Sequence, residues 1–394
     1  MPELRPGPWL RLTALFAAAA CCAAVVSGAL ELGAAHRGLA ALALPTLVAL
    51  VAAAWVEYRR LLVPALTALL AFLAAALVIS KPAHLALAGL SLAATLVVTA
   101  ETFRGEPVAP APWRDYITLT KPRIMTLLLL TGAAGMFVGA EGVPPLGLFA
   151  VTMAGLALAC GGSSALNHVL DRDLDRLMHR TGHRPVAEER VTPERAVEFG
   201  LALMAFSFVL LASLVNVLTA VLALVGGLFY VLVYTRWLKR STPQNIVIGG
   251  AAGAVPPLVG WAAATGNLSI PALFLFLIVF FWTPPHFWAL ALVIKRDYAA
   301  ARVPMLPVVR GDDETARQIV WYSLVLVAVT LLPFAWHTAG VAYLVAALLL
   351  GAIFLRFAWR LRRETTTARA GALFKYSLLY LALLFVALAV DPLL

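Results

Sequence analysis

The chain has 394 residues, of which 62% are hydrophobic and only 13% are charged. Soluble domains carry roughly 25% charged residues, so this composition excludes an ordinary soluble enzyme and indicates a protein with many membrane spans. The formal net charge of +10 would suggest nucleic acid as the partner of a soluble protein. In a membrane protein such cations lie in loops that face anionic lipid. We therefore expect the lipid bilayer, and no nucleic acid, among its partners.

Apolar runs long enough to cross a bilayer, about 20 residues each, divide the chain into two groups. The first group contains four runs, near 10–31, 37–57, 61–80 and 83–103. A polar, proline-rich stretch follows and is typical of a linker. We predict a four-span membrane domain over 1–104, a linker over 105–112 and a second domain over 113–394.

The second domain contains nine further apolar runs, near 116–139, 146–168, 195–214, 218–235, 245–264, 270–292, 317–336, 339–357 and 371–390. The predicted fold class is an all-α polytopic membrane protein, with a nine-helix bundle after a four-helix transmembrane segment. None of the lysines and arginines after residue 105 lies in the loops at 140–146, 263–270 and 335–341. By the positive-inside rule, the long polar loops on the other side face the cytoplasm, across the inner membrane of a bacterial-type cell.

The loop after the second of these nine runs carries a regular series of polar side chains. Asn167, Asp171 and Asp175 are spaced four residues apart, and at about 100° per residue they project from one face of a helix. Carboxylate and amide oxygens are ligands that Mg²⁺ prefers and shares with substrate phosphates. A solvated loop helix with Asp–Arg pairs is the alternative, but carboxylates at a membrane boundary are costly without a cation. We predict a Mg²⁺ site at these three residues, with Asp173 pointing away from it.

Four loops on one side of the membrane bring cations towards this site. They contain the segments 120–123, 167–185, 234–245 and 282–307. Together they suit an amphiphile with an anionic head and an isoprenoid-like tail. The predicted catalytic residues are Asn167, Asp171, Asp175 and Asp297. The predicted substrate-binding residues are Lys121, Arg123, Arg172, Arg176, His179, Arg180, Arg184, Lys239, Arg240, Asn245, His286, Lys295, Arg296 and Tyr298.

These motifs resemble those of a known family. Asn167-x3-Asp171-x3-Asp175 in a nine-span protein is similar to the first aspartate-rich motif of the intramembrane prenyltransferases, the UbiA superfamily. The strings Thr-Lys-Pro-Arg at 120–123, Trp-Thr-Pro-Pro-His-Phe-Trp-Ala-Leu at 282–290, and those at 245–257 and 297–309, resemble its haem-modifying branch over about 113–394. The wider superfamily has paired aspartates in its second motif. This chain has Asp297 preceded by Lys295 and Arg296, as that branch does.

The resemblance implies a Mg²⁺-dependent transfer of the farnesyl group of farnesyl diphosphate to a vinyl group of haem b. The products would be haem O and diphosphate, on the route to haem A. Aromatic faces would shelter the allylic cation, with Tyr230, Tyr234, Trp282 and Trp288 as candidates. His286 would contact haem iron or propionate, or merely satisfy a kinked Pro-Pro helix. Two alternatives remain open: a prenyltransferase for a quinone-ring or chlorophyll-type acceptor, and a non-catalytic haem-binding or transport protein.

The first four spans carry two histidines at matching depth. His36 begins the second span and His84 begins the fourth, which places both on the outer side if the amino terminus is cytoplasmic. Two histidines of a four-helix bundle can bind one haem axially, whereas a lone interfacial histidine is more often structural. The strings around these histidines resemble one half of haem A synthase. The resemblance implies a degenerate domain that hands over haem or docks a partner such as haem A synthase.

Overall fold

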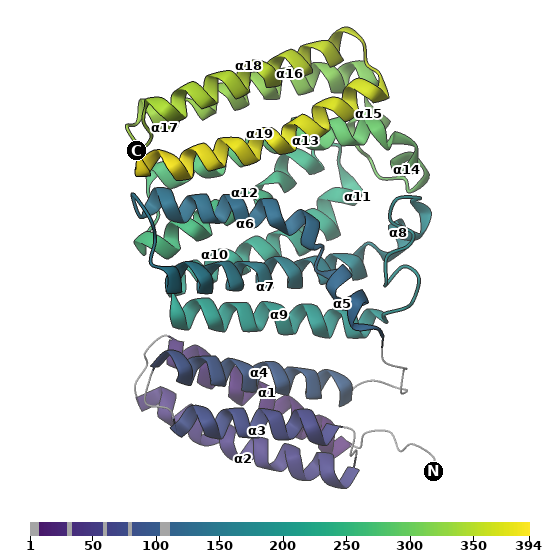
Figure 1. The fold of residues 1–394 in the computed structure, drawn as a ribbon. Coiled ribbons are helices and arrows are strands. Elements are labelled where there is room, and N and C mark those ends of the chain that lie inside the picture. Colours follow the sequence, from purple (N-terminus) through teal and green to yellow (C-terminus); the bar gives the residue numbers. More distant parts are fainter. Residues whose placement is uncertain (1–7, 30–33, 58–60, 78–80, 103–110) are drawn as a thin grey trace.

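The computed structural model describes residues 8–29, 34–57, 61–77, 81–102 and 111–394, and within these ranges the secondary structure is helical throughout, with no strand. Figure 1 shows two stacked groups of helices with nearly parallel axes. The smaller group contains α1 (Pro8–Ala29), α2 (Ala34–Glu57), α3 (Leu62–Leu77) and α4 (Lys81–Thr102). The predicted linker, 105–112, lies outside the described residues except for its last two, and so do the final residues of the predicted spans 10–31, 61–80 and 83–103.

The larger group follows from residue 113 onward. Its helices are α5 (Trp113–Leu119), α6 (Pro122–Gly139), α7 (Leu146–Leu170), α8 (Arg172–Leu177), α9 (Pro193–Leu214), α10 (Val217–Leu228), the π-helix η2 (Phe229–Leu238), α11 (Lys239–Ser241), α12 (Asn245–Thr265), α13 (Ile270–Val293), α14 (Lys295–Ala300), α15 (Leu306–Val309), α16 (Gly311–Thr330), α17 (Leu332–Ala335), α18 (Val341–Arg363), α19 (Thr367–Val390) and η3 (Asp391–Leu393).

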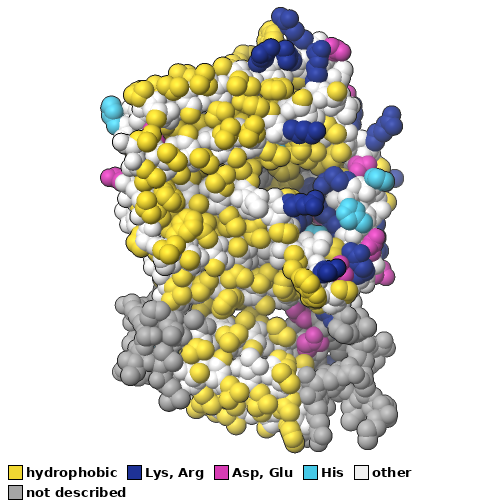
Figure 2. Space-filling model, viewed as in Figure 1, with side chains coloured by type: hydrophobic (Ala, Val, Ile, Leu, Met, Phe, Trp, Pro, Cys, Tyr) yellow, Lys and Arg dark blue, Asp and Glu magenta, His cyan; other side chains and the backbone are white. Residues whose placement is uncertain are grey.

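The predicted fold class is confirmed. In the described part of the chain, nine helices are long and apolar enough to cross a membrane, and they coincide with the nine runs predicted after residue 113. The described parts of α1 to α4 contain shorter apolar stretches, so the four additional spans stay a prediction. Figure 2 shows hydrophobic side chains along the helices, with most cationic and acidic side chains at the end of the larger group where α8 and α14 lie.

The predicted span at 116–139 is wrong at its beginning, because the chain breaks into α5 and α6. Lys121 adopts a left-handed conformation, with φ of 51°, and Pro122 begins α6. Proline disfavours helical conformation in the residue before it and cannot donate a backbone hydrogen bond. The hydroxyl of Ser164 donates to the last carbonyl of α5, Leu119 O, at 2.7 Å. The break leaves Lys121 beside α7 rather than on the outside of a continuous helix.

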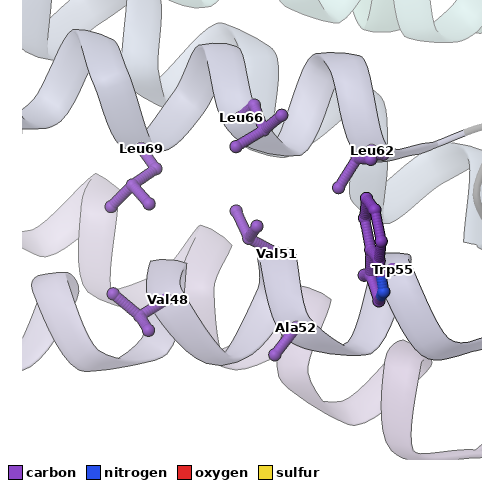
Figure 3. Close-up of a pocket in the computed structure, with 7 residues that line it drawn as sticks. All are labelled: Val48, Val51, Ala52, Trp55, Leu62, Leu66 and Leu69. Atoms are coloured by element: carbon purple, nitrogen blue, oxygen red, sulfur yellow. The ribbon is translucent and has the colours of Figure 1, made fainter.

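The amino-terminal group contacts the larger one through α4, which packs along α9. Val209 of α9 belongs to the apolar core of the amino-terminal group, where it lies against Gly89 of α4. On the side of α2 and α3 there is a groove of about 420 Å³ (Figure 3). Its lining is entirely apolar and includes Val51, Trp55 and Leu66. Such a lining is what a helix face in contact with lipid requires.

Two helices of the larger group approach closely through glycine. A side chain at Gly260 of α12 would collide with the backbone of α6 at Gly132 and Met136. Small residues allow membrane helices to pack backbone against backbone, which contributes van der Waals contact where lipid offers no hydrophobic driving force. The α6–α12 pair therefore depends on the absence of a side chain at this position.

We expect Gly260→Ala to lower the stability of the protein, because the two helices must separate to admit a methyl group. Overpacking of this kind costs about 1–3 kcal/mol, and thermal unfolding of the purified protein in detergent measures it. Gly253→Ala on the same helix is the control, since nothing lies within 4 Å of a methyl group there. Equal unfolding temperatures for the two variants would show that the close approach is unimportant.

Candidate active site

Three buried polar side chains lie where α7 ends, at the charged end of the larger group. Asn167, Asp171 and Asp175 are 3%, 1% and 2% exposed. The expectation of one continuous helix is wrong at Asp171, where α7 stops and α8 begins one residue later. The backbone bonds Asp171 N to Asn167 O (2.9 Å) and Asp175 N to Asp171 O (2.8 Å) nevertheless keep the four-residue spacing through the bend. The three side chains therefore stay on the inward side.

Each of these three side chains contacts a cation, two of them from other segments and one from the same loop. Lys239 Nζ lies 2.6 Å from Asp171 Oδ2. Arg184 Nη1 donates to both oxygens of Asp175, at 2.9 and 2.8 Å. Lys121 Nζ donates to Asn167 Oδ1 at 2.5 Å.

These pairs compensate for the cost of burying two carboxylates, which would otherwise be several kcal/mol per ion. Burial, followed by the nearby charge of Arg184, lowers the pKa of Lys121 well below its ordinary value. Burial thus disfavours the charged form of Lys121, whereas the nearby carboxylates of Asp171 and Asp175 favour it.

Several buried polar atoms in the segments that build the site have no hydrogen-bond partner among the described residues. They are Asp171 Oδ1, both ring nitrogens of His168 and both side-chain polar atoms of Asn245. Buried polar groups in proteins are almost always hydrogen-bonded. The unpartnered oxygen of Asp171 fits a site that takes polar ligand atoms, such as a divalent cation with a diphosphate. His168 was not among the predicted site residues, because nothing in its sequence context separates it from a core histidine.

The second predicted loop reaches the same cluster. Asp297, in α14, accepts a hydrogen bond from the backbone N–H of Arg180 at 3.2 Å. Tyr298 beside it is buried, and this burial raises the pKa of its hydroxyl. The expectation that the Asp/Arg loop and the 295–298 segment share one side of the bundle is therefore confirmed.

The π-helix η2 supplies residues that lie against the cluster. Tyr230 and Tyr234 stack with their ring centroids 5.7 Å apart. Thr235 is fully buried, and its hydroxyl lies 3.0 Å from Asn167 Nδ2. A π-helix is rare and frequent at functional sites, and no sequence signal here distinguishes it from an α-helix. Thr235 was consequently not predicted.

The remaining predicted cations lie further out. Arg240 pairs with Asp173 at 2.7 Å, and the hydrogen bond from Arg240 lowers the pKa of Asp173. The exposed position of Asp173 confirms that it points away from the cluster. Arg176 pairs with Glu189 and Lys295 with Asp312, both at the surface. Five further predicted residues have exposed side chains at the surface around the cluster's loops: Arg123, Arg172, His179, Arg180 and Arg296.

His286 lies in the bundle core among aromatic rings. It stacks on Trp282 and Phe374, with centroids 4.2 and 4.8 Å away. Its Nδ1 is 2.7 Å from Ser377 Oγ, and that hydroxyl donates to Phe374 O. Because a hydroxyl has one proton, Ser377 accepts from His286, whose Nδ1 carries the hydrogen. The structure thus satisfies this histidine within the core, in a tautomer whose Nε2 holds a lone pair.

The two histidines of the amino-terminal group lie together. The ring centroids of His36 and His84 are 5.8 Å apart, with the planes at 78°. Each Nδ1 is within hydrogen-bond distance of a backbone carbonyl, Ala24 O at 2.9 Å for His36 and Ala75 O at 2.6 Å for His84. Since α4 runs towards α5, this pair lies at the end of the helices away from α8 and α14 (Figure 1).

The sequence around this site and its fold match those of a known protein family. The model of the UbiA prenyltransferase family matches residues 128–385, which include the acidic cluster, η2 and α14. The chain belongs to the UbiA prenyltransferase family. Solved UbiA-family structures share the fold. A digeranylgeranylglyceryl phosphate synthase has a TM-score of 0.60 at 17% identity, covering 71% of this chain and 98% of that one.

A UbiA homologue from Archaeoglobus fulgidus bound to GPP and Mg²⁺ has a TM-score of 0.52 at 16% identity, covering 70% of this chain and 99% of its own. Curated UbiA relatives are named protoheme IX farnesyltransferase. The one from Roseiflexus sp. is 52% identical over 316 residues, 80% of this chain and 57% of that protein, so this chain spans just over half of its length. The one from Symbiobacterium thermophilum is 54% identical over 280 residues, 71% of this chain and 94% of that protein.

The buried and exposed ion pairs of this UbiA-family site should differ in their effect on stability. Arg184→Gln leaves Asp175 buried without its cation, which costs about 3–5 kcal/mol. Arg240→Gln breaks an exposed pair worth about 0–1 kcal/mol. Thermal unfolding in detergent at neutral pH compares the two variants. Similar shifts would contradict the assignment of Arg184 as the cation that compensates Asp175.

Proposed function

We propose that this protein transfers the farnesyl group of farnesyl diphosphate to a vinyl group of haem b, giving haem O and diphosphate. The observation that carries the proposal is the buried cluster of Asn167, Asp171 and Asp175, with cations around it from two other segments and from its own loop. The acceptor follows from the relatives named protoheme IX farnesyltransferase, which are 52–54% identical. The haem O product would then serve haem A formation.

Magnesium fits the donor set of this cluster. Asn167, Asp171 and Asp175 offer one amide and two carboxylate groups, and Asp171 Oδ1 has no protein partner. Hard oxygen donors of this kind suit Mg²⁺, and a UbiA homologue has been solved bound to GPP and Mg²⁺. These three residues would hold the metal, with Asp297 completing the site through the facing loop. The metal would supply positive charge to the diphosphate leaving group.

The cations of the cluster have a second role in the proposed reaction. Lys239 and Arg184 neutralise Asp171 and Asp175. With a metal bound to these carboxylates, the two cations would be available to the oxygens of the diphosphate. Lys121 and Asn245 line the same mouth. The outer residues proposed to receive the diphosphate or the haem propionates are Arg123, Arg172, Arg176, His179, Arg180, Arg240, Lys295, Arg296 and Tyr298.

Departure of diphosphate breaks the bond between farnesyl C1 and oxygen and leaves an allylic cation. The haem vinyl group forms the new bond to C1, and water adds to the resulting cation and loses a proton, which gives the hydroxyethylfarnesyl group. The stacked rings of Tyr230 and Tyr234 are placed to stabilise the cation through their faces. His286 would contact the haem through its Nε2. In this proposal the mouth of the site faces the cytoplasm across the inner membrane.

A different acceptor, of the quinone-ring or chlorophyll type, is the second candidate, because the acidic cluster recognises the diphosphate and not the acceptor. Purified protein incubated with farnesyl diphosphate, Mg²⁺ and either haem b or an aromatic acid decides between them by mass spectrometry of the products. Haem O supports the proposal. Prenylation of the aromatic acid alone would overturn it, and no product at all would favour a haem-binding or transport protein.

We expect Asp171→Asn and Asp175→Asn to lower haem O formation by about 10²-fold or more, since each loses an anionic ligand of the metal that would stabilise the leaving group. Asp173→Asn is the matched control in the same segment, because Asp173 is exposed and pairs only with Arg240. The measurement is the haem O yield of folded variants at fixed Mg²⁺. Near-normal turnover by Asp171→Asn would contradict the site, and an equal loss in Asp173→Asn would contradict its position.

We further propose that residues 1–104 form a haem-binding domain that is dispensable for farnesyl transfer and delivers haem or docks a partner such as haem A synthase. His36 and His84 would be axial ligands, since each Nδ1 is held by a carbonyl, which fixes the ring as a metal ligand through Nε2. The pair lies at the opposite end from Asp171, about 30 Å away across a bilayer. It therefore cannot share the catalytic pocket.

In the full-length protein, we expect His36→Ala and His84→Ala to remove a low-spin haem absorption spectrum while leaving farnesyl transfer from saturating haem b unchanged. His337→Ala, an exposed histidine in the larger group, is the control for general effects on haem uptake. An unchanged haem spectrum in both variants would show that these histidines are structural. Lost farnesyl transfer would show that this group of helices belongs to the enzyme.

A further inference from the structure

We infer that Thr235 is a positioning residue that sets the orientation of the Asn167 amide, and thereby which atom of Asn167 is offered to the metal and diphosphate. The inference rests on the proposed function of the acidic cluster and adds to it a residue outside the Asn/Asp motif. Thr235 is fully buried in η2, which is separated from α7 in sequence by α8, α9 and α10. The Thr235 hydroxyl has a single proton, so it can donate to only one of its partners.

The Thr235 hydroxyl has two partners in the structure. Its Oγ1 donates to Tyr230 O at 2.9 Å and lies 3.0 Å from Asn167 Nδ2. A hydroxyl has one proton and a carbonyl can only accept. The proton is therefore committed to Tyr230 O, and towards Asn167 the hydroxyl acts only as an acceptor.

An acceptor at this place decides between the two orientations of the Asn167 amide. The NH₂ group must point to Thr235, and it also donates to Asp171 Oδ2 at 2.8 Å. The carbonyl oxygen then points to the other side, where it accepts from Lys121. If Asp171 were taken up as a metal ligand, Thr235 would remain the acceptor that, with Lys121 on the opposite side, keeps the amide from turning over. Without it, the amide can present NH₂, which repels a cation, in place of oxygen.

The π-helical winding of η2 makes this arrangement possible. In an α-helix, residues five apart are about 140° apart around the axis, so the Thr235 hydroxyl would not reach Tyr230 O. The π-helix closes its turns between residues five apart, which places the hydroxyl over that carbonyl. The chain then continues to Lys239, which contacts Asp171. One locally widened segment thus delivers partners to both Asn167 and Asp171.

The test compares Thr235→Val, which keeps the shape but loses the acceptor, with Thr235→Ser, which keeps the hydroxyl. Mn²⁺ binding to the full-length protein with inorganic diphosphate, followed by electron paramagnetic resonance of the free ion, gives a readout independent of turnover. Loss of a group that orients a metal ligand typically lowers metal affinity about 10–100-fold. We expect that loss in Thr235→Val and near wild-type affinity in Thr235→Ser. In the farnesyl-transfer assay, we expect the metal concentration for half-maximal rate to rise by a larger factor than the factor by which the rate at saturating metal falls.

Thr152→Val is the matched control, since Thr152 is equally buried at the far end of α7 and its hydroxyl donates to Leu148 O at 2.8 Å. Wild-type Mn²⁺ affinity in Thr235→Val would overturn the inference. So would a loss of Mn²⁺ affinity in Thr235→Ser and Thr152→Val as large as that in Thr235→Val. If Thr235→Val fails to fold, Thr235→Ala against Thr235→Ser makes the same comparison. The Asp171→Asn variant, measured alongside, distinguishes a failure of the Thr235 inference from a failure of the proposed metal site. Unchanged Mn²⁺ affinity in Asp171→Asn would refute the metal site itself.

Discussion

The cost of placing carboxylates at the end of membrane-spanning helices organises this protein. Asp171 and Asp175 are 1% and 2% exposed, and a buried carboxylate without a counter-charge would be neutralised or would unfold its surroundings. Each is matched by one cation, Lys239 from the end of η2 or Arg184 from the loop after α8. The polar end of the bundle is therefore a network of compensated charges, and the same groups are those that a metal and a diphosphate would use.

The irregular backbone near this network follows from the same requirement. The break between α5 and α6 brings Lys121 to Asn167, the bend at Asp171 joins α7 to α8, and η2 brings Thr235 and Lys239 to the cluster. Regular α-helices continued through these three places would direct the side chains elsewhere. Departures from helical geometry are tolerated in membrane proteins where they line a protein interior or a cavity, and here all three surround one site.

Much of the fold could be predicted from the sequence, because apolar runs and the distribution of cations report directly on spans and sidedness. The inward direction of Asn167, Asp171 and Asp175 and the outward direction of Asp173 followed from their spacing. The individual ion pairs could not be predicted, since charge counts do not tell that Arg240 bonds Asp173 while Lys239 bonds Asp171. The π-helix was also out of reach, because its residues have no composition that distinguishes them, and Thr235 was missed for that reason. His168 of α7 was missed because its sequence context is that of a core histidine.

The contact between α4 and α9 restricts the directions from which molecules dissolved in the bilayer can approach the bundle. Molecules with long apolar tails dissolve in the membrane and approach a helical bundle sideways, through gaps between its helices. Along α9 that approach is closed, because α4 lies against it and Val209 is enclosed within the apolar core of the amino-terminal group. Any membrane-dissolved molecule must therefore approach the acidic cluster from another side of the bundle. The four amino-terminal helices thus block lateral access along α9.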